Sequence, residues 1–189
     1  MAGAAAERKV RVAELALRAL LCGLAALAAA LVATDAQTRT FFSFQKKATF
    51  RDMKAMVFLV VATGVAAGYS LLQAARCCCC GGLHQPTRRR ALAWCVFSCD
   101  QALAYAVLAA LAAALQASVI AKRGQPELQW MGICAMYGAF CRQAGGGLAS
   151  AVGAAVAAVL VAFISAFNLF RLYGDKSRGA RNYGAGATW

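Results

Sequence analysis

The sequence predicts an all-α fold, a four-helix transmembrane bundle with both termini in the cytoplasm. The chain of 189 residues is 62% hydrophobic and only 14% charged, with a mean hydropathy of +0.61. Crossing ~30 Å of hydrocarbon takes about 20 apolar residues in a helix. Runs of that length occur at 15–34, 53–75, 91–120 and 147–170. We therefore predict one membrane domain over 15–170, with tails at 1–14 and 171–189, the second of which should be flexible.

The basic residues between the runs set the orientation, because Lys and Arg accumulate in short cytoplasmic loops. More of them fall in the two tails and the middle loop than in the first and third loops. This bias places both termini in the cytoplasm. The formal net charge of +13 is scattered over loops and tails, which favours contact with anionic membrane lipid and not with nucleic acid. A cleaved signal peptide is an alternative for the first run, although Arg18 would have no purpose in a discarded segment.

Asp100 is the most informative residue, because it lies well inside the third apolar run. Ionising a carboxylate there without a partner costs several kcal/mol. Its helical neighbours at three and four residues' distance cannot neutralise it, and Arg18 in the first run is the other well-embedded charge. Both helices would run outward, so the depths of the two residues are comparable. We predict a structural intramembrane ion pair between Arg18 and Asp100.

Alternatives to the pair remain open. Arg18 could extend to lipid headgroups while Asp100 is protonated, or Asp100 could serve as an ion or proton relay. At 100° per residue, a leucine face and an alanine face divide the first helix, and Arg18 falls on the alanine face. Because small residues allow close helix contact in a membrane, the alanine face is expected to point inward.

Three glycines are predicted to lie at helix packing surfaces. Gly64 and Gly68 form a GxxxG step in the second run, and Gly153 lies in the fourth. Such steps permit backbone contact between membrane helices. The Gly64–Gly68 step could serve self-association or packing within one molecule.

The loops offer further candidate sites. Aromatic residues beside cations suit a membrane interface, and those of the first loop could also face a partner outside the cell; they are Phe41, Phe42 and Phe44. Cysteines next to Arg76 at the cytoplasmic boundary are candidates for palmitoylation, and a zinc site is not expected from four adjacent residues; they are Cys77, Cys78, Cys79 and Cys80. Cys134 and Cys141 would face an oxidising compartment, where a disulfide is expected.

These residues together resemble the Casparian strip membrane domain-like family of plants, which is itself similar to the MARVEL four-helix membrane proteins. The family has an Arg in its first helix and an Asp in its third, which match Arg18 and Asp100. The stretch from Thr40 to Ala55, TFFSFQKKATFRDMKA, and the outer-loop Trp130, Cys134 and Cys141 are similar to one subgroup. Nearly the whole chain takes part in the resemblance, and the loop match is its specific part.

The resemblance implies a non-enzymatic plasma-membrane scaffold that self-associates into homo- or hetero-oligomeric platforms. Founding members guide local cell-wall modification, so cell-wall-modifying proteins are possible partners. This chain has Thr38-Arg39-Thr40 where those members carry a longer acidic and aromatic stretch, which favours a broader role than the Casparian strip. A small transporter or channel is the alternative. No catalytic pairing, metal cluster or cofactor motif is evident, and the lone His84 argues against His-dependent chemistry.

Overall fold

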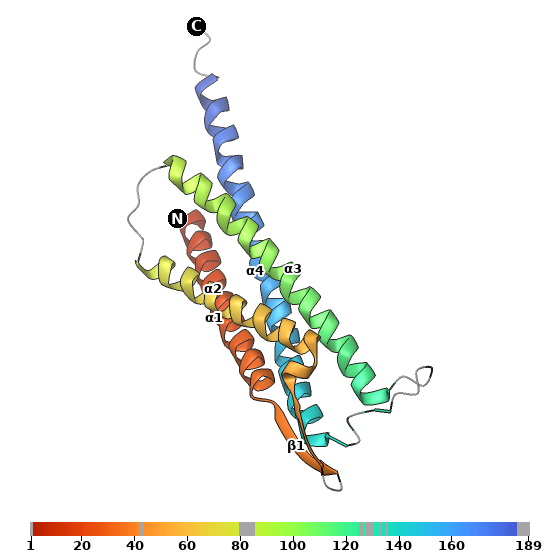
Figure 1. Ribbon diagram of the computed structural model, residues 1–189. Coiled ribbons are helices and arrows are strands. Elements are labelled where there is room, and N and C mark those ends of the chain that lie inside the picture. Colours follow the sequence, from red (N-terminus) through yellow and green to blue (C-terminus); the bar gives the residue numbers. More distant parts are fainter. Residues whose placement is uncertain are drawn as a thin grey trace.

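The structure is a computed structural model that describes residues 2–41, 44–79, 86–124, 127, 131–132, 134 and 136–184. Within these ranges the chain forms four long helices and a β-hairpin (Figure 1). The elements are α1 (Ala2–Ala33), β1 (Ala36–Phe41), β2 (Phe44–Thr49), the short 3₁₀ helix η1 (Phe50–Asp52), α2 (Lys54–Cys79), α3 (Pro86–Arg123) and α4 (Gly138–Gly184). All four helices are long and apolar enough to cross a membrane, which confirms the predicted four-helix membrane fold.

The helices form a bundle in which α1 and α3 lie diagonally opposite each other. α1 packs along both α2 and α4, and α3 packs against the same two helices, whereas α1 and α3 make only marginal backbone contact among the described residues. The N-terminus and the end of α4 lie at one end of the bundle, and the hairpin lies at the other (Figure 1). Four crossings return the chain to the side on which it began.

Small side chains fill the core. The buried stripe on α1 consists of Arg18, Leu21, Ala25, Ala28 and Val32, spaced by three and four residues. The predicted division of α1 into a leucine face toward lipid and an alanine face inward is therefore wrong in part. Leu21 is 1% exposed, whereas residues 26 and 33, both alanines, lie outside.

Glycines on α4 bring that helix close to α1. A Cβ at Gly147 would stand 2.6 Å from Cγ2 of Val32, and one at Gly153 would stand 3.0 Å from Cδ1 of Leu24. The predicted packing role of Gly153 is thus realised within one molecule.

The helices extend beyond the apolar runs. α4 continues through 171–184, the greater part of the tail that was expected to be flexible. This part of the tail contains no proline, so a helix nucleated in the membrane span can propagate through it. α3 ends at Arg123 because Gly124 adopts a φ of 71°, and its N–H donates to the carbonyl of Ile120 at 2.8 Å.

A β-hairpin in the first loop was not predicted. β1 and β2 are antiparallel, and their pairing runs from Ala36 opposite Thr49 to Phe41 opposite Phe44. Thr and Phe favour extended backbone, and they recur through this segment. At its base, Asp52 accepts hydrogen bonds from the N–H and the hydroxyl of Thr49, at 2.8 and 3.0 Å. The fold is thus helical in the membrane with a small sheet outside it.

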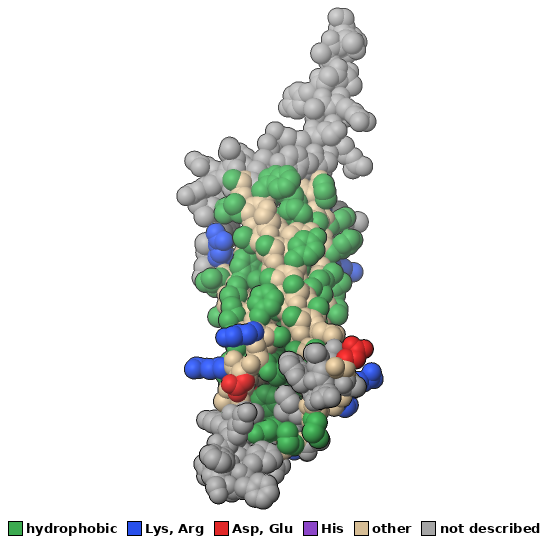
Figure 2. Space-filling model, turned by 45° about the vertical axis from the view of Figure 1, so that its right-hand side comes forward, with side chains coloured by type: hydrophobic (Ala, Val, Ile, Leu, Met, Phe, Trp, Pro, Cys, Tyr) green, Lys and Arg blue, Asp and Glu red, His purple; other side chains and the backbone are tan. Residues whose placement is uncertain are grey.

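The outer surface of the bundle is apolar. Figure 2 shows hydrophobic side chains over the middle of one face, with charged groups at its edges and toward the hairpin end. The exposed side chains on the spans include Val61, Val65, Leu72, Tyr105 and Phe163. Such a surface is stable against lipid tails and would be unfavourable in water.

Candidate functional site

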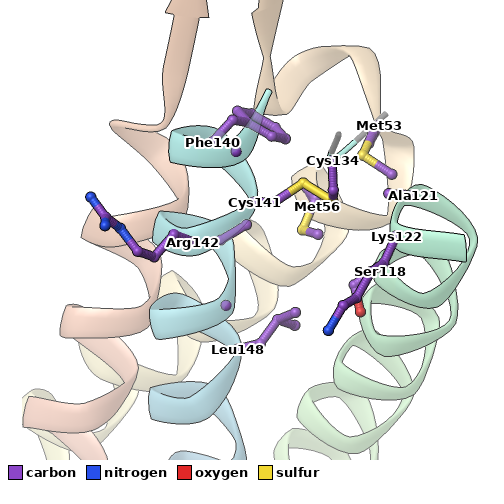
Figure 3. Close-up of a pocket in the computed structure, with 13 residues that line it drawn as sticks. Met53, Met56, Ser118, Ala121, Lys122, Cys134, Phe140, Cys141, Arg142 and Leu148 are labelled. Atoms are coloured by element: carbon purple, nitrogen blue, oxygen red, sulfur yellow. A yellow bond between two sulfur atoms is a disulfide. The ribbon is translucent and has the colours of Figure 1, made fainter. Parts of the chain in front are cut away.

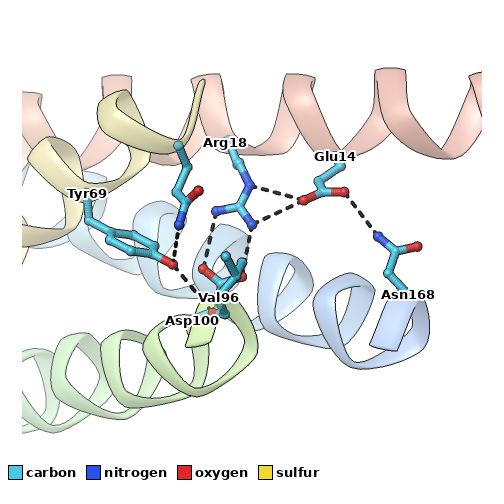
Figure 4. Close-up of polar contacts among 7 residues, drawn as sticks. Glu14, Arg18, Tyr69, Val96, Asp100 and Asn168 are labelled. Carbon is cyan, nitrogen blue, oxygen red and sulfur yellow. Dashed lines mark hydrogen bonds and ion pairs between the residues drawn. The ribbon is translucent and has the colours of Figure 1, made fainter. Parts of the chain in front are cut away.

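Arg18 and Asp100 lie against each other across the diagonal of the bundle (Figure 4). Nη1 of Arg18 donates to Oδ1 of Asp100 at 3.2 Å, and Nη2 donates to Oδ2 at 2.9 Å. The two side chains are 6% and 1% exposed. This bidentate contact joins α1 to α3, which make only marginal backbone contact otherwise. A planar guanidinium fits a carboxylate in this way, and a lysine would not.

Glu14 supplies a second carboxylate, one helical turn before Arg18. Its Oε1 accepts hydrogen bonds from Nε and Nη2 of Arg18, at 3.3 and 3.1 Å. Its other oxygen accepts from Nδ2 of Asn168 on α4 at 3.1 Å. The Glu14 side chain is 28% exposed, so it connects the buried pair to the surface. The guanidinium is therefore held by carboxylates on two sides.

Tyr69 lies on the other side of Asp100, on α2. Its hydroxyl accepts a hydrogen bond from Nε2 of Gln73 at 2.8 Å and donates to the carbonyl of Val96 on α3 at 3.4 Å. Polar contacts thus connect all four helices at one level of the bundle (Figure 4). We call Glu14, Arg18, Tyr69, Asp100 and Asn168 the charge cluster.

The contacts of the charge cluster fit a structural role, in which the cluster holds the helices together. Its one cation is bonded to both acids, so no described member presents a free nucleophile or an activated base. Over the described residues, no three His, Cys, Asp or Glu side chains lie together as a metal site.

The opposite end of the bundle contains a second set of polar contacts. Cys134 and Cys141 form a disulfide that ties the third loop to the start of α4. Gln143 donates to the carbonyl of Leu31 at 3.0 Å and to the hydroxyl of Thr34 at 3.2 Å, which holds α4 to the end of α1.

Asp35 lies at this end, between α1 and the hairpin, and is 3% exposed. Its Oδ2 atom has no hydrogen-bond partner among the described residues. Burial raises the pKa of Asp35 to about 6, although a hydrogen bond with the Ala144 backbone opposes the shift. A pocket of about 280 Å³ beside it is also lined by Thr49, Phe50 and Arg51.

The remaining candidate residues fall into three groups. Gly64 and Gly68 are exposed, and an added Cβ at either would have no atom within 4 Å, so they do not serve packing inside this molecule. Phe41 and Phe44 face each other in the hairpin register, and residues 77–79 continue α2 as helix, but the side chains of these residues lie outside the described part. Phe42, Cys80 and Trp130 lie outside the described residues altogether.

Comparison with known proteins places this arrangement in a family. The chain matches the Casparian strip membrane protein domain over residues 7–169, which includes all five members of the charge cluster. The chain belongs to that family. It is 76% identical to CASP-like protein 2U1 of Sorghum bicolor over 179 residues, covering 92% of this chain and 93% of the relative. It is 62% identical to CASP-like protein 2B1 of Oryza sativa subsp. japonica, covering 97% and 96%.

A third relative, CASP-like protein 2U1 of Zea mays, is 73% identical over 93% of this chain and 94% of its own length. The matching domain is named for a membrane protein. No solved structure matches the chain. The predicted resemblance to the plant family is therefore confirmed.

Sequence reasoning missed Glu14 and Asp35 as members of these polar sites. A signal for Glu14 was present, because an acid four residues before an Arg faces it on a helix. Asp35 carried no such signal. Its position depends on which way the base of the hairpin turns.

Proposed function

We propose that this protein is a non-enzymatic plasma-membrane scaffold that associates with copies of itself and with related four-span proteins into oligomeric platforms. The observation that carries the proposal is the outward-facing step on α2, where Gly64 and Gly68 meet no other part of the molecule. Small residues four positions apart let two helix backbones approach closely in a membrane. An exposed GxxxG motif of this kind can pack against a helix from a second copy or from a related four-span protein.

The charge cluster supports a structural role over a transporting one. A transport path requires connected ionisable or polar groups across the membrane. Here the two acids and the guanidinium bind each other at one level of the bundle. Elsewhere on the spans, the hydroxyl of Thr63 turns back on its own helix and donates to the carbonyl of Leu59 at 2.7 Å.

The hairpin supports the second part of the proposal. It projects beyond the helices at the end opposite the start of α1 and the end of α4 (Figure 1), and the bias in basic residues predicts that this end lies outside the cell. We infer that the platforms organise membrane subdomains and that the hairpin contacts proteins involved in local cell-wall modification.

Chemical crosslinking in native membranes tests the scaffold. The wild-type protein should yield dimers and larger species, and a Gly64→Leu, Gly68→Leu double variant should lower their fraction several-fold. The matched control is Gly23→Leu, which also adds a side chain into open space on an exposed helix face. Equal yields from the double variant would show that α2 is not the interface, and an exclusively monomeric wild type would refute the scaffold. Substrate-dependent flux in liposomes would favour a transporter instead.

A further inference from the structure

Two cysteine pairs lie toward opposite ends of the bundle and are in different chemical states. Cys134 and Cys141 form the disulfide at the hairpin end, where they line a pocket of about 410 Å³ that Lys122 also lines (Figure 3). Cys95 and Cys99 are free cysteines in the first half of α3, which begins at the end of the bundle where α1 starts (Figure 1). This second pair lies outside the charge cluster.

The spacing of Cys95 and Cys99 prevents a disulfide between them. Cβ atoms four residues apart on a helix are separated by about 5–6 Å, whereas a disulfide needs a Cβ separation of about 3.5–4.5 Å. The start of α3 also follows three consecutive arginines at 88–90, and the bias in basic residues predicts that this end lies in the cytoplasm, where disulfides are rare. The states of the two pairs therefore agree with one topology, oxidised outside the cell and reduced inside.

Both thiols are open to the surroundings of the bundle. Cys95 and Cys99 are exposed, and they share one face of α3 because they are about one helical turn apart. Small exposed side chains border them on this face; they are Ala91, Ser98 and Ala102. Cys22 on α1, in contrast, is half-buried. A membrane enzyme can therefore approach the two sulfur atoms on α3 from the side.

The thiols lie near the predicted cytoplasmic surface of the membrane. The candidate span of α3 begins at Ala91, so at 1.5 Å per residue Cys95 lies ~6 Å along the helix from that boundary and Cys99 lies ~12 Å from it. Trp94 is 48% exposed immediately before Cys95, and tryptophan is enriched at the interface between lipid and water. Cys22 lies ~21 Å beyond the start of its own span, which is much deeper.

We propose that Cys95, together with Cys99 one turn deeper, is S-acylated with a long-chain fatty acyl group. The donor is a long-chain acyl-coenzyme A, used by an acyltransferase of the same membrane. The cysteine sulfur attacks the thioester carbonyl, the bond from that carbonyl to the coenzyme A sulfur breaks, and the cysteine proton passes to the released coenzyme A thiol. The exchange needs no oxidant. Cysteines close to the membrane surface are the usual acceptors of such chains.

The surroundings of the two thiols favour an acyl group over other thiol modifications. The exposed face of α3 is in contact with lipid tails, where a fatty acyl chain remains in hydrocarbon. A charged adduct on the same sulfur would have to be placed in hydrocarbon, at a cost of several kcal/mol. The modification is independent of self-association, so it can occur in a monomer.

The test uses the full chain, expressed in plant cells that are fed a long-chain fatty acid with a terminal alkyne. The background variant lacks the other acylation candidates; its changes are Cys77→Ser, Cys78→Ser, Cys79→Ser and Cys80→Ser. This protein should carry the label, and neutral hydroxylamine should release it, as expected of a thioester. Mass spectrometry should place the label on Cys95 and Cys99, in the background variant and in the wild type. Adding Cys95→Ala and Cys99→Ala should lower the label several-fold.

Cys22→Ala is the matched control, because it removes a deeper and half-buried thiol from a neighbouring span. It should leave the label unchanged. Formation of the Cys134–Cys141 disulfide, followed on non-reducing gels, verifies that each variant folds. Label confined to residues 77–80, or label that resists hydroxylamine, would overturn the proposal. Equal labelling of Cys22 would overturn it as well, because depth and exposure would then not select the site.

Discussion

Asp100 and Asp35 are both buried aspartates, yet the fold surrounds them differently. Asp100 lies within the span Ala91–Arg123, and Arg18 binds both of its oxygens. Asp35 lies at the base of the hairpin, and its Oδ2 atom has no partner among the described residues. Asp100 joins α1 to α3 through Arg18, whereas burial raises the pKa of Asp35 to about 6.

The difference follows from the surroundings of each residue. Within the bilayer core no water can stabilise an unpaired carboxylate, so a cation from the diagonal helix must supply the contact. At the edge of the bundle, water lies near enough that protonation and local opening relieve an unpaired one. The comparison predicts that the charge cluster acts mainly on stability, and that Asp35 makes stability depend on pH.

The largest effect is expected from Arg18→Met, which leaves two carboxylates without their cation. Removing one partner of a buried ion pair typically costs about 3–5 kcal/mol. We expect a loss of that size in the free energy of unfolding, measured by denaturation in detergent micelles. Arg18→Asp combined with Asp100→Arg should recover part of the loss caused by Arg18→Asp alone. Strictly additive losses would show that the two residues are not directly coupled.

The disulfide should contribute next, at the Asp35 end of the bundle. Cys134 and Cys141 are separated by 7 positions, and closing so short a loop contributes roughly 2–3 kcal/mol by restricting the unfolded chain. The double variant Cys134→Ser, Cys141→Ser should lower the thermal midpoint accordingly. It should leave the Arg18–Asp100 coupling energy unchanged, because the two sites lie at different levels of the bundle. A change in that coupling would show that the two ends are not independent.

Asp35→Asn tests the prediction that Asp35 makes the stability of the protein depend on pH. Burial raises the pKa of Asp35 from its ordinary value of 3.8 to about 6, so the folded state binds the proton more tightly. Stability should therefore fall as pH rises from about 4 to about 6 and then level off. The stability of Asp35→Asn should not fall over this pH range, and the variant should be more stable than the wild type at pH 7. Unfolding midpoints across pH 3.5–7.5 measure it, and an unchanged profile would show that Asp35 is not responsible.

The smallest effect is expected from Glu14→Gln. Glu14 is partly exposed, and Asp100 still holds the guanidinium when the charge of Glu14 is removed. We expect a loss of about 0.5–1.5 kcal/mol, the usual net contribution of a hydrogen bond. Asn168→Ala serves as the companion variant, because it removes only the contact of Glu14 with α4. A Glu14→Gln loss as large as that of Arg18→Met would mean that Asp100 is the minor partner.

By itself the sequence determined the four membrane spans, because length and apolarity alone decide whether a helix can cross a bilayer. It also required a partner for Asp100 and indicated Arg18, since few charges are available at that depth. Glu14 could have been added from its spacing alone. The hairpin could have been suspected from the Thr and Phe residues of the first loop, although short strands depend strongly on their surroundings.

Only the tertiary structure decided which face of each helix turns inward. On α1 the buried stripe takes Leu21 together with alanines, and on α2 the Gly64–Gly68 step faces outward while Gly147 and Gly153 on α4 contact α1. In a chain so rich in alanine and leucine, several rotations of a helix bury similar apolar area, so periodicity cannot choose among them. The choice depends on how four helices fit at once, and it also leaves Asp35 without a full set of partners and forms the pocket beside Lys122.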